Sequence, residues 1–101
     1  MSQSFGSFRE FYPHYLGEHS NIVCRRLHYL GSTLALTFIA LAFVRGNAWW
    51  ALGALFSGYG FAWIGHFFFE KNRPATFTHP LYSFAADWVM LRDMLTGRIR
   101  F

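Results

Sequence analysis

The five histidines are the residues of this sequence whose side chains are best suited to bind a metal ion. They are His14, His19, His28, His66 and His79. Neutral imidazole is a common ligand of iron and zinc, and carboxylates often accompany it. The single cysteine provides neither a thiolate cluster nor an intrachain disulfide. Any metal chemistry in this chain is therefore expected to use nitrogen and oxygen ligands.

His28 and His66 lie at nearly equal distances from a turn signal. Arg45-Gly46-Asn47 separates two apolar stretches and predicts the turn of a helical hairpin. Both histidines then lie roughly 28–29 Å from that turn, at 1.5 Å per residue. Helices in contact lie about 8–10 Å apart, a gap that two imidazoles can bridge through one ion. The spacing sets depth and not rotation, so the facing of the two rings is an assumption.

Rows of small residues precede His66 and follow His28. They are Ala54, Gly58 and Ala62 on the second stretch, and Gly31 and Ala35 on the first. In membranes, rows of this kind mark close contact between helices. We therefore expect His66 to face protein and not lipid.

Several ionisable residues lie near the histidine pair. Glu70 lies one turn beyond His66 on the same face, where its carboxylate could bind the metal or orient the ring. Arg25 lies one turn before His28 and could hold a substrate carboxylate. We expect Asp87 to form an ion pair with an arginine. For His14 we expect only a backbone or headgroup partner.

The elements that must position these residues are apolar helices. Hydrophobic residues make up 53% of the 101 residues and charged residues only 14%, below the roughly 25% of soluble domains. Spans are expected at about 22–44 and 48–69, and a third helix at about 80–96 that lies on the surface or inserts partway. We predict an all-α fold, a single helical membrane domain over 1–101 built on an antiparallel transmembrane hairpin with flanking interfacial helices. A hairpin buried in a soluble bundle is the alternative.

The positive charges predict an orientation in the membrane. Eight of the nine lysines and arginines lie on the side of the termini, and only Arg45 lies at the turn. The eight are Arg9, Arg25, Arg26, Lys71, Arg73, Arg92, Arg98 and Arg100. This bias predicts that both termini are cytoplasmic, in the inner membrane of a bacterium or the endoplasmic reticulum of a eukaryote. The net charge of +4 indicates contact with the lipid bilayer, and no nucleic acid partner is expected.

Four segments of the chain resemble one family. They are Phe11-Tyr12, His19-Ser20-Asn21, Leu27-His28 and the run from Gly65-His66 through Glu70-Lys71-Asn72-Arg73-Pro74-Ala75. Together they resemble the signature of small membrane proteins typified by the eukaryotic 2-hydroxy fatty acid dioxygenase. Those proteins act in the α-oxidation of the hydroxy acid that arises in phytosphingosine breakdown.

The resemblance implies an iron(II)-dependent enzyme that uses dioxygen. Carried over by position, the essential histidines are His19, His28 and His66, with Glu70 beside them. His79 lies outside the shared run and is taken as a candidate fourth metal ligand. The implied substrate is a long-chain 2-hydroxy fatty acid, which chelates iron through its carboxylate and hydroxyl and loses C1.

Three basic residues are candidates for neutralising the substrate carboxylate that the resemblance implies. They are Arg25, Lys71 and Arg73, all near the expected membrane surface. The acyl tail is expected to lie in an apolar channel of the hairpin.

Two other functions remain open from the sequence. Histidines at equal depth on antiparallel spans also hold transmembrane haem, which would give a Soret band. A non-enzymatic lipid-binding or scaffold protein would contain no stoichiometric metal. Acyl chain length, and whether the chain forms a homo-oligomer, are not determined by these patterns.

Overall fold

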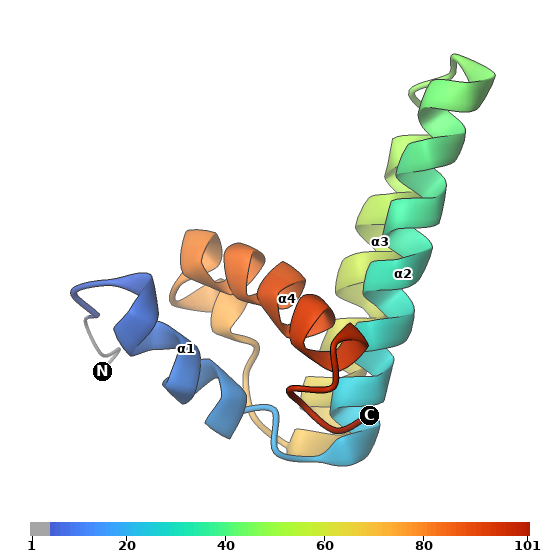
Figure 1. Ribbon diagram of the computed structural model, residues 1–101. Helices are drawn as coiled ribbons and strands as arrows, with labels where there is room; N and C mark the ends of the chain where they lie inside the picture. The colour runs from blue at the N-terminus through green and yellow to red at the C-terminus, as the bar shows by residue number, and fades with distance from the viewer. Residues whose placement is uncertain (1–4) are drawn as a thin grey trace.

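The computed structural model describes residues 5–101, which form helices and connecting segments and no strand. The elements are α1 (Phe8–Gly17), α2 (Ile22–Arg45), α3 (Trp50–Ile64), the π-helix η1 (Gly65–Glu70), the 3-10 turn η2 (Ala75–Phe77) and α4 (Pro80–Leu95). In Figure 1, α2 and α3 form a long hairpin, and α1 and α4 pack beside the part of it farthest from the turn. The prediction of an all-α fold is confirmed.

Local signals define both ends of α2. The side chain of Asn21 accepts hydrogen bonds from the backbone N–H groups of Val23 (2.9 Å) and Cys24 (3.3 Å), which satisfies two free donors of the first turn. At the other end, Gly46 adopts a left-handed conformation with φ of 63°, which glycine tolerates without a Cβ clash. The predicted turn therefore lies at the tip of the hairpin.

Two helices are long and apolar enough to cross a membrane. One is α2, with 24 residues, and the other is the 21-residue segment Trp50–Glu70 that α3 and η1 form together. A span needs about 20 residues at 1.5 Å each, so both are long enough to cross a hydrocarbon core. The two helices indicate association with a membrane.

The two long helices approach each other closely at small residues. A Cβ added to Gly31 would lie 2.7 Å from the backbone oxygen of Ser57, and one added to Gly65 would lie 2.8 Å from Cys24 Sγ. Buried members of the predicted small-residue rows are Gly31, Ala35, Ala54 and Ala62. The rows therefore lie at the helix contact, as small-residue rows do in membrane helix pairs.

Helices α1 and α4 pack against each other and form a second layer. Phe11 and Tyr15 from α1 pack with Ala86, Met90 and Met94 from α4 in one buried cluster. With 16 residues, α4 is about 24 Å long and shorter than a full span of about 30 Å. In Figure 1 it lies inclined to one side of the hairpin, with its C-terminal end next to α2.

Candidate metal centre

Three histidines from different segments meet in the interior of the protein. His19 Nε2 lies 3.1 Å from His28 Nε2 and 2.9 Å from His66 Nε2. The ligand atoms of all three lie within 4.8 Å of one another. Their exposed fractions are 1%, 4% and 2%, so the cluster is closed to bulk water. We call these three residues the histidine cluster.

The predicted facing of His28 and His66 across the hairpin is confirmed. Their ring centroids lie 5.0 Å apart, with His28 near the start of α2 and His66 in η1. His19 reaches the same point from the connection between α1 and α2, next to the C-cap residue Glu18. The cluster thus joins the hairpin to the layer of α1 and α4.

Two of the rings are oriented by backbone carbonyls. His19 Nδ1 lies 2.6 Å from the carbonyl oxygen of Tyr15, and His28 Nδ1 lies 2.9 Å from that of Cys24. A carbonyl oxygen only accepts hydrogen bonds, so each Nδ1 carries the proton. In each neutral ring, Nε2 is then left with a lone pair.

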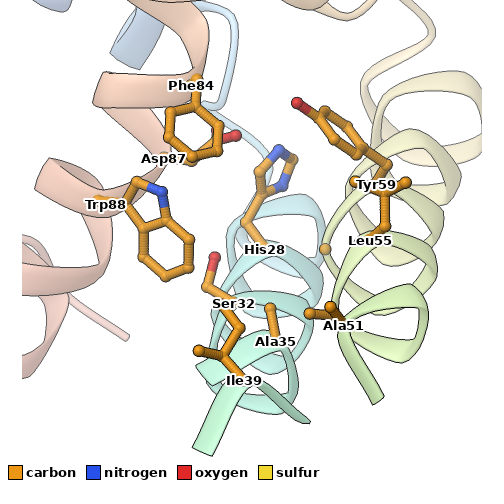
Figure 2. A pocket seen from close by; sticks show the side chains of 12 residues that line it. His28, Ser32, Ala35, Ile39, Ala51, Leu55, Tyr59, Phe84, Asp87 and Trp88 are labelled. Carbon is orange, nitrogen blue, oxygen red and sulfur yellow. The ribbon is translucent and has the colours of Figure 1, made fainter. Parts of the chain in front are cut away.

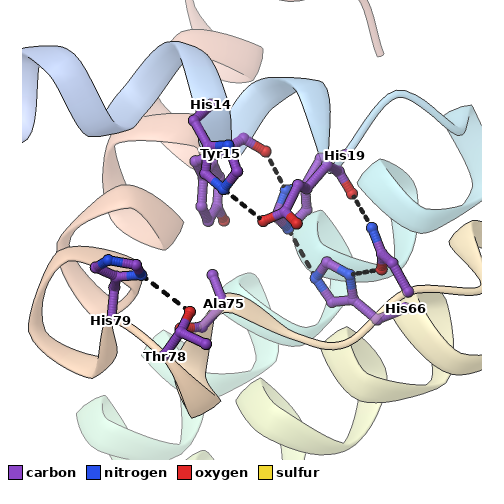
Figure 3. Close-up of polar contacts among 9 residues, drawn as sticks. His14, Tyr15, His19, His66, Ala75, Thr78 and His79 are labelled. Atoms are coloured by element: carbon purple, nitrogen blue, oxygen red, sulfur yellow. Dashed lines mark hydrogen bonds and ion pairs between the residues drawn. The ribbon is translucent and has the colours of Figure 1, made fainter. Parts of the chain in front are cut away.

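The third ring is oriented by an amide side chain. His66 Nδ1 lies 2.7 Å from Oδ1 of Asn72, while Nδ2 of Asn72 donates to the carbonyl oxygen of Glu18 at 3.1 Å. The second contact requires that Asn72 present its oxygen to the ring, so His66 also carries its proton on Nδ1. Figure 3 shows the rings of His19 and His66 with their nitrogens facing each other.

The chain reverses sharply to place Asn72. Lys71, which follows η1, adopts a left-handed conformation with φ of 58°, and its N–H donates to the carbonyl oxygen of His66. The N–H of Asn72 donates to the same oxygen at 3.1 Å. The wide turn of the π-helix therefore brings Asn72 back against the ring that it orients.

These contacts fit a bound cation. Three Nε2 lone pairs point at one another without a hydrogen between them, which is repulsive unless a cation lies among them. Burial, together with the neighbouring imidazoles of His28 and His66, holds the pKa of His19 well below its usual range, so a proton is poorly held there. Oriented neutral imidazoles of this kind are typical metal ligands.

The space beside the cluster fits a small ion and not a haem. The cavity that all three rings line has a volume of about 10 Å³. This is roughly the space of one water molecule. A porphyrin does not fit between rings whose centroids lie 4.4–5.0 Å apart. The geometry therefore disfavours the haem alternative.

Tyr15 and Asp87 form a polar pair beside the cluster. The Tyr15 ring stacks on that of His19, with centroids 4.0 Å apart, and its hydroxyl donates to the Asp87 carboxyl. Burial raises the pKa of Asp87 to about 6, and the hydrogen bond from Tyr15 opposes this shift. Burial and the nearby Asp87 raise the pKa of Tyr15 well above its usual range. The partner of Asp87 is thus a tyrosine, and the expectation of an arginine ion pair was wrong.

The structure does not bring His79 to the cluster. Its ring packs against those of Phe5 and Phe11, with centroids 5.1 and 5.4 Å apart, and Nδ1 lies 2.9 Å from the hydroxyl of Thr78 (Figure 3). His79 lies at the N-cap of α4, and it does not line the cavity at the cluster.

Glu70 also lies apart from the three nitrogens. Its carboxylate accepts a hydrogen bond from the backbone N–H of Asn21, at the start of α2. A negative charge at this end of a helix is favourable, because the first N–H groups have no partner within the helix. Glu70 therefore connects the end of η1 to the start of α2.

The predicted carboxylate-binding arginines make other contacts. Arg25 donates through Nη2 to the carbonyl oxygen of Arg100 at 3.3 Å. The guanidinium of Arg73 lies over the Phe77 ring, 5.5 Å from its centroid. Neither side chain lines the cavity at the cluster.

Three polar residues of the site, Tyr15, Asn72 and Trp63, were missed from the sequence alone. Asn72 lies in the run that carries the family resemblance, but its spacing from His66 gave no reason to single it out. Trp63 lines the cavity at the cluster, and among residues 5–101 its buried Nε1–H has no hydrogen-bond partner. An unpaired buried donor beside a set of lone pairs indicates a place for a ligand oxygen.

A family model described as 2-hydroxy-palmitic acid dioxygenase Mpo1-like matches residues 5–99. The match includes all three histidines of the cluster together with Asn72, Tyr15 and Asp87. Neither a curated protein nor a solved structure matches the chain.

Proposed function

Because the chain belongs to the 2-hydroxy-palmitic acid dioxygenase Mpo1-like family, we propose that it is an iron(II)-dependent dioxygenase of long-chain 2-hydroxy fatty acids. The reaction removes C1 and leaves a fatty acid one carbon shorter. One dioxygen molecule accounts for the oxidation, since the hydroxy acid and O2 give the shorter acid, carbon dioxide and water. The observation that carries the proposal is the convergence of three buried Nε2 lone pairs.

We assign the metal ligands as His19, His28 and His66. When bound there, iron(II) supplies a Lewis acid for the carboxylate and hydroxyl of the substrate and the redox chemistry for dioxygen. Three neutral imidazoles leave the charge of the ion uncompensated, so the site favours an anionic ligand such as a carboxylate. The site would therefore favour a carboxylate without a contribution from Arg25 or Arg73.

The remaining residues of the site orient ligands and exclude water. Tyr15 covers one face of the His19 ring and is itself held by Asp87, so this imidazole has little freedom to rotate. The indole N–H of Trp63 is available to donate to an oxygen of the substrate. Burial of the cluster keeps bulk water from the reacting carbon.

We further propose that α2 and the segment Trp50–Glu70 span the bilayer, with the cluster near the cytoplasmic surface. Both contributing histidines of the hairpin lie at the ends of the helices far from the turn, on the side with the excess of positive charge. A fatty acid then keeps its carboxylate at the surface and its tail among lipids. The fatty acid therefore does not have to leave the bilayer for water in order to reach the site.

The proposal is tested with the purified chain in lipid nanodiscs, loaded with iron(II) and supplied with oxygen and 2-hydroxypalmitic acid. We expect pentadecanoic acid as product, and none from palmitic acid, which lacks the hydroxyl. His66→Gln abolishes the product, whereas the matched variant His14→Gln retains it, because His14 pairs with Glu18 outside the cluster. An iron-loaded wild type that forms no shortened acid contradicts the proposal and leaves the lipid-binding alternative.

A further inference from the structure

An apolar groove begins at the histidine cluster and follows α2 toward the hairpin turn. Its volume is about 210 Å³, and side chains of α2, α3 and α4 line it. At one end lie His28, Tyr59 and Asp87, and the same three residues line the small cavity at the cluster. Figure 2 shows His28 at this end, with side chains of all three helices around the space. The groove and the candidate metal site are therefore continuous.

The groove has the length and surface of a site for a hydrocarbon chain. From His28 to Ile39 it follows α2 for about 16 Å at 1.5 Å per residue. Ala35 forms part of its floor, and Phe84 and Trp88 of α4 form one wall (Figure 2). Beyond the cluster end, Ser32 and the Trp88 indole are the polar groups of a lining that is otherwise hydrocarbon. A water-soluble ligand would find few partners there.

We propose that this groove holds the hydrocarbon tail of the 2-hydroxy fatty acid, with the carboxyl end at His28 and the methyl end toward Ile39 and Ala51. The inference rests on the proposed function, which supplies the chemical class of the ligand. Two observations support this occupant: the polar end of the groove adjoins the small cavity that the three histidines line, and its far end leads along helices apolar enough to lie in lipid. The tail then enters sideways from the bilayer.

A second apolar groove lies along α3 and must be distinguished from the first. It is lined by Phe56 and Gly60 together with Tyr59 and Trp63, and no histidine contributes to it. A tail in this second groove would leave its carboxyl group next to Trp63 and not at His28. The first groove is preferred because His28 lines it directly.

Ala51 is positioned to limit the length of the tail. It lines the far end of the groove, and its side chain is exposed, so a larger residue there fills the groove without displacing a buried neighbour. Ala51→Trp is therefore expected to lower kcat/KM for the longest substrates by about tenfold relative to shorter ones. Ala40→Trp is the matched control, because Ala40 is an exposed alanine of α2 outside the groove lining.

Photolabelling tests the occupant without turnover. Palmitic acid with a diazirine at its methyl end is photolysed with the purified chain in nanodiscs, in the absence of iron and oxygen, and the labelled residues are mapped by mass spectrometry. We expect label at Ile39 and Ala51, which line the first groove and not the second, and excess 2-hydroxypalmitic acid should displace it. Ala51→Trp lowers this displaceable label to background, and Ala40→Trp does not.

The outcomes separate the groove from the reaction. Displaceable label at Phe56 and Gly60, or none anywhere, overturns the groove, and this mapping on the wild type depends on no variant. Label in the expected places without any turnover supports the groove and contradicts the dioxygenase function. Turnover with a chain-length profile that Ala51→Trp leaves unchanged supports the reaction and overturns the groove.

Discussion

Nε2 of His19 and Nε2 of His66 lie 2.9 Å apart although 47 residues separate them in the sequence. Each ring uses its Nδ1 proton on an oxygen, so the two facing nitrogens both present lone pairs. Such an approach is stable when the nitrogens share a cation, and this relationship leads to the first prediction.

Removing a nitrogen of the cluster is expected to remove the metal. Purified wild type should contain about one iron or zinc ion per chain, and His66→Gln should contain far less, because two imidazoles bind weakly. His79→Gln should retain the ion, since its ring packs against Phe5 and Phe11. Elemental analysis measures both. Equal losses in the two variants would exclude the histidine cluster as the site.

Asn72 is expected to strengthen metal binding through His66. In Asn72→Ala the ring loses the acceptor that orients it, and metal affinity should fall by about 10- to 100-fold. Asn72→Asp retains an oxygen at this position and should recover most of the affinity. Competition with a chromophoric chelator gives the dissociation constants. An affinity unchanged in Asn72→Ala would mean that the ring needs no such partner.

The metal-free protein is expected to lose stability in acid through His19. The pKa of His19 is lowered in the folded state, so the unfolded chain binds its proton first. The contribution of His19 is complete above the unfolded pKa of about 6.5 and is lost as the pH falls below it, by up to about 1.4 kcal/mol per pH unit. Unfolding in mixed detergent micelles between pH 7 and pH 5 measures this loss.

Asp87 changes the stability with pH in the opposite direction to His19, so the experiment requires a control. Its pKa is raised to about 6 in the folded state, so its contribution is present below the unfolded value of about 4 and is lost as the pH rises through 6. The difference between wild type and His19→Gln isolates the histidine. A wild type no more sensitive to acid than His19→Gln would contradict the assignment.

The pair of Tyr15 and Asp87 is expected to be energetically coupled. Tyr15→Phe leaves the carboxyl without its donor and should lower the free energy of unfolding by about 1–3 kcal/mol. The double variant Tyr15→Phe with Asp87→Leu should lose less than the sum of the single losses, since no polar group is then left unpaired. Additive losses in such a cycle would show that the two groups do not interact.

Close approach of the helices is expected to make Gly31 intolerant of a side chain. A Cβ there would lie 2.7 Å from the backbone oxygen of Ser57, so Gly31→Ala must push α2 and α3 apart and weaken metal binding. Gly60→Ala is the matched control, because a Cβ at Gly60 meets nothing within 4 Å. It should be neutral or stabilising by about 0.5–1 kcal/mol. Thermal unfolding with a metal assay compares the two, and equal tolerance would contradict the close contact.

Helical geometry made part of the site predictable from the sequence. The rise per residue relates position to depth, so two histidines at nearly equal distances from the hairpin turn had to lie at nearly the same level once the hairpin formed. The small residues Gly31 and Ala35 then indicated which face of α2 meets α3. For the residues of α2, local patterns suffice because the helix that carries them is regular.

The rest of the site depends on the segments that connect the helices, whose path no fixed rise per residue predicts. His19 lies outside any regular helix, and Asn72 reaches His66 only because Lys71 reverses the chain. Tyr15 and Asp87 meet because α1 packs on α4, a contact between elements far apart in the sequence. Glu70 was expected on the same helix face as His66, and His79 in a segment next to the ligands. The side chain of Glu70 instead contacts the backbone of Asn21, and that of His79 contacts Thr78.

The three histidines of the cluster come from different parts of the chain, and this has a thermodynamic consequence for the layer of α1 and α4. Two belong to the hairpin, whereas the third comes from the segment that carries α1. An ion bound by all three histidines crosslinks these two parts of the protein. When the concentration of free metal exceeds its dissociation constant, metal binding therefore stabilises the packing of α1 against the rest of the protein. Iron supply would then govern how firmly the amino-terminal region is held, so starvation for the metal would loosen this part of the chain while the membrane-embedded pair of helices persists.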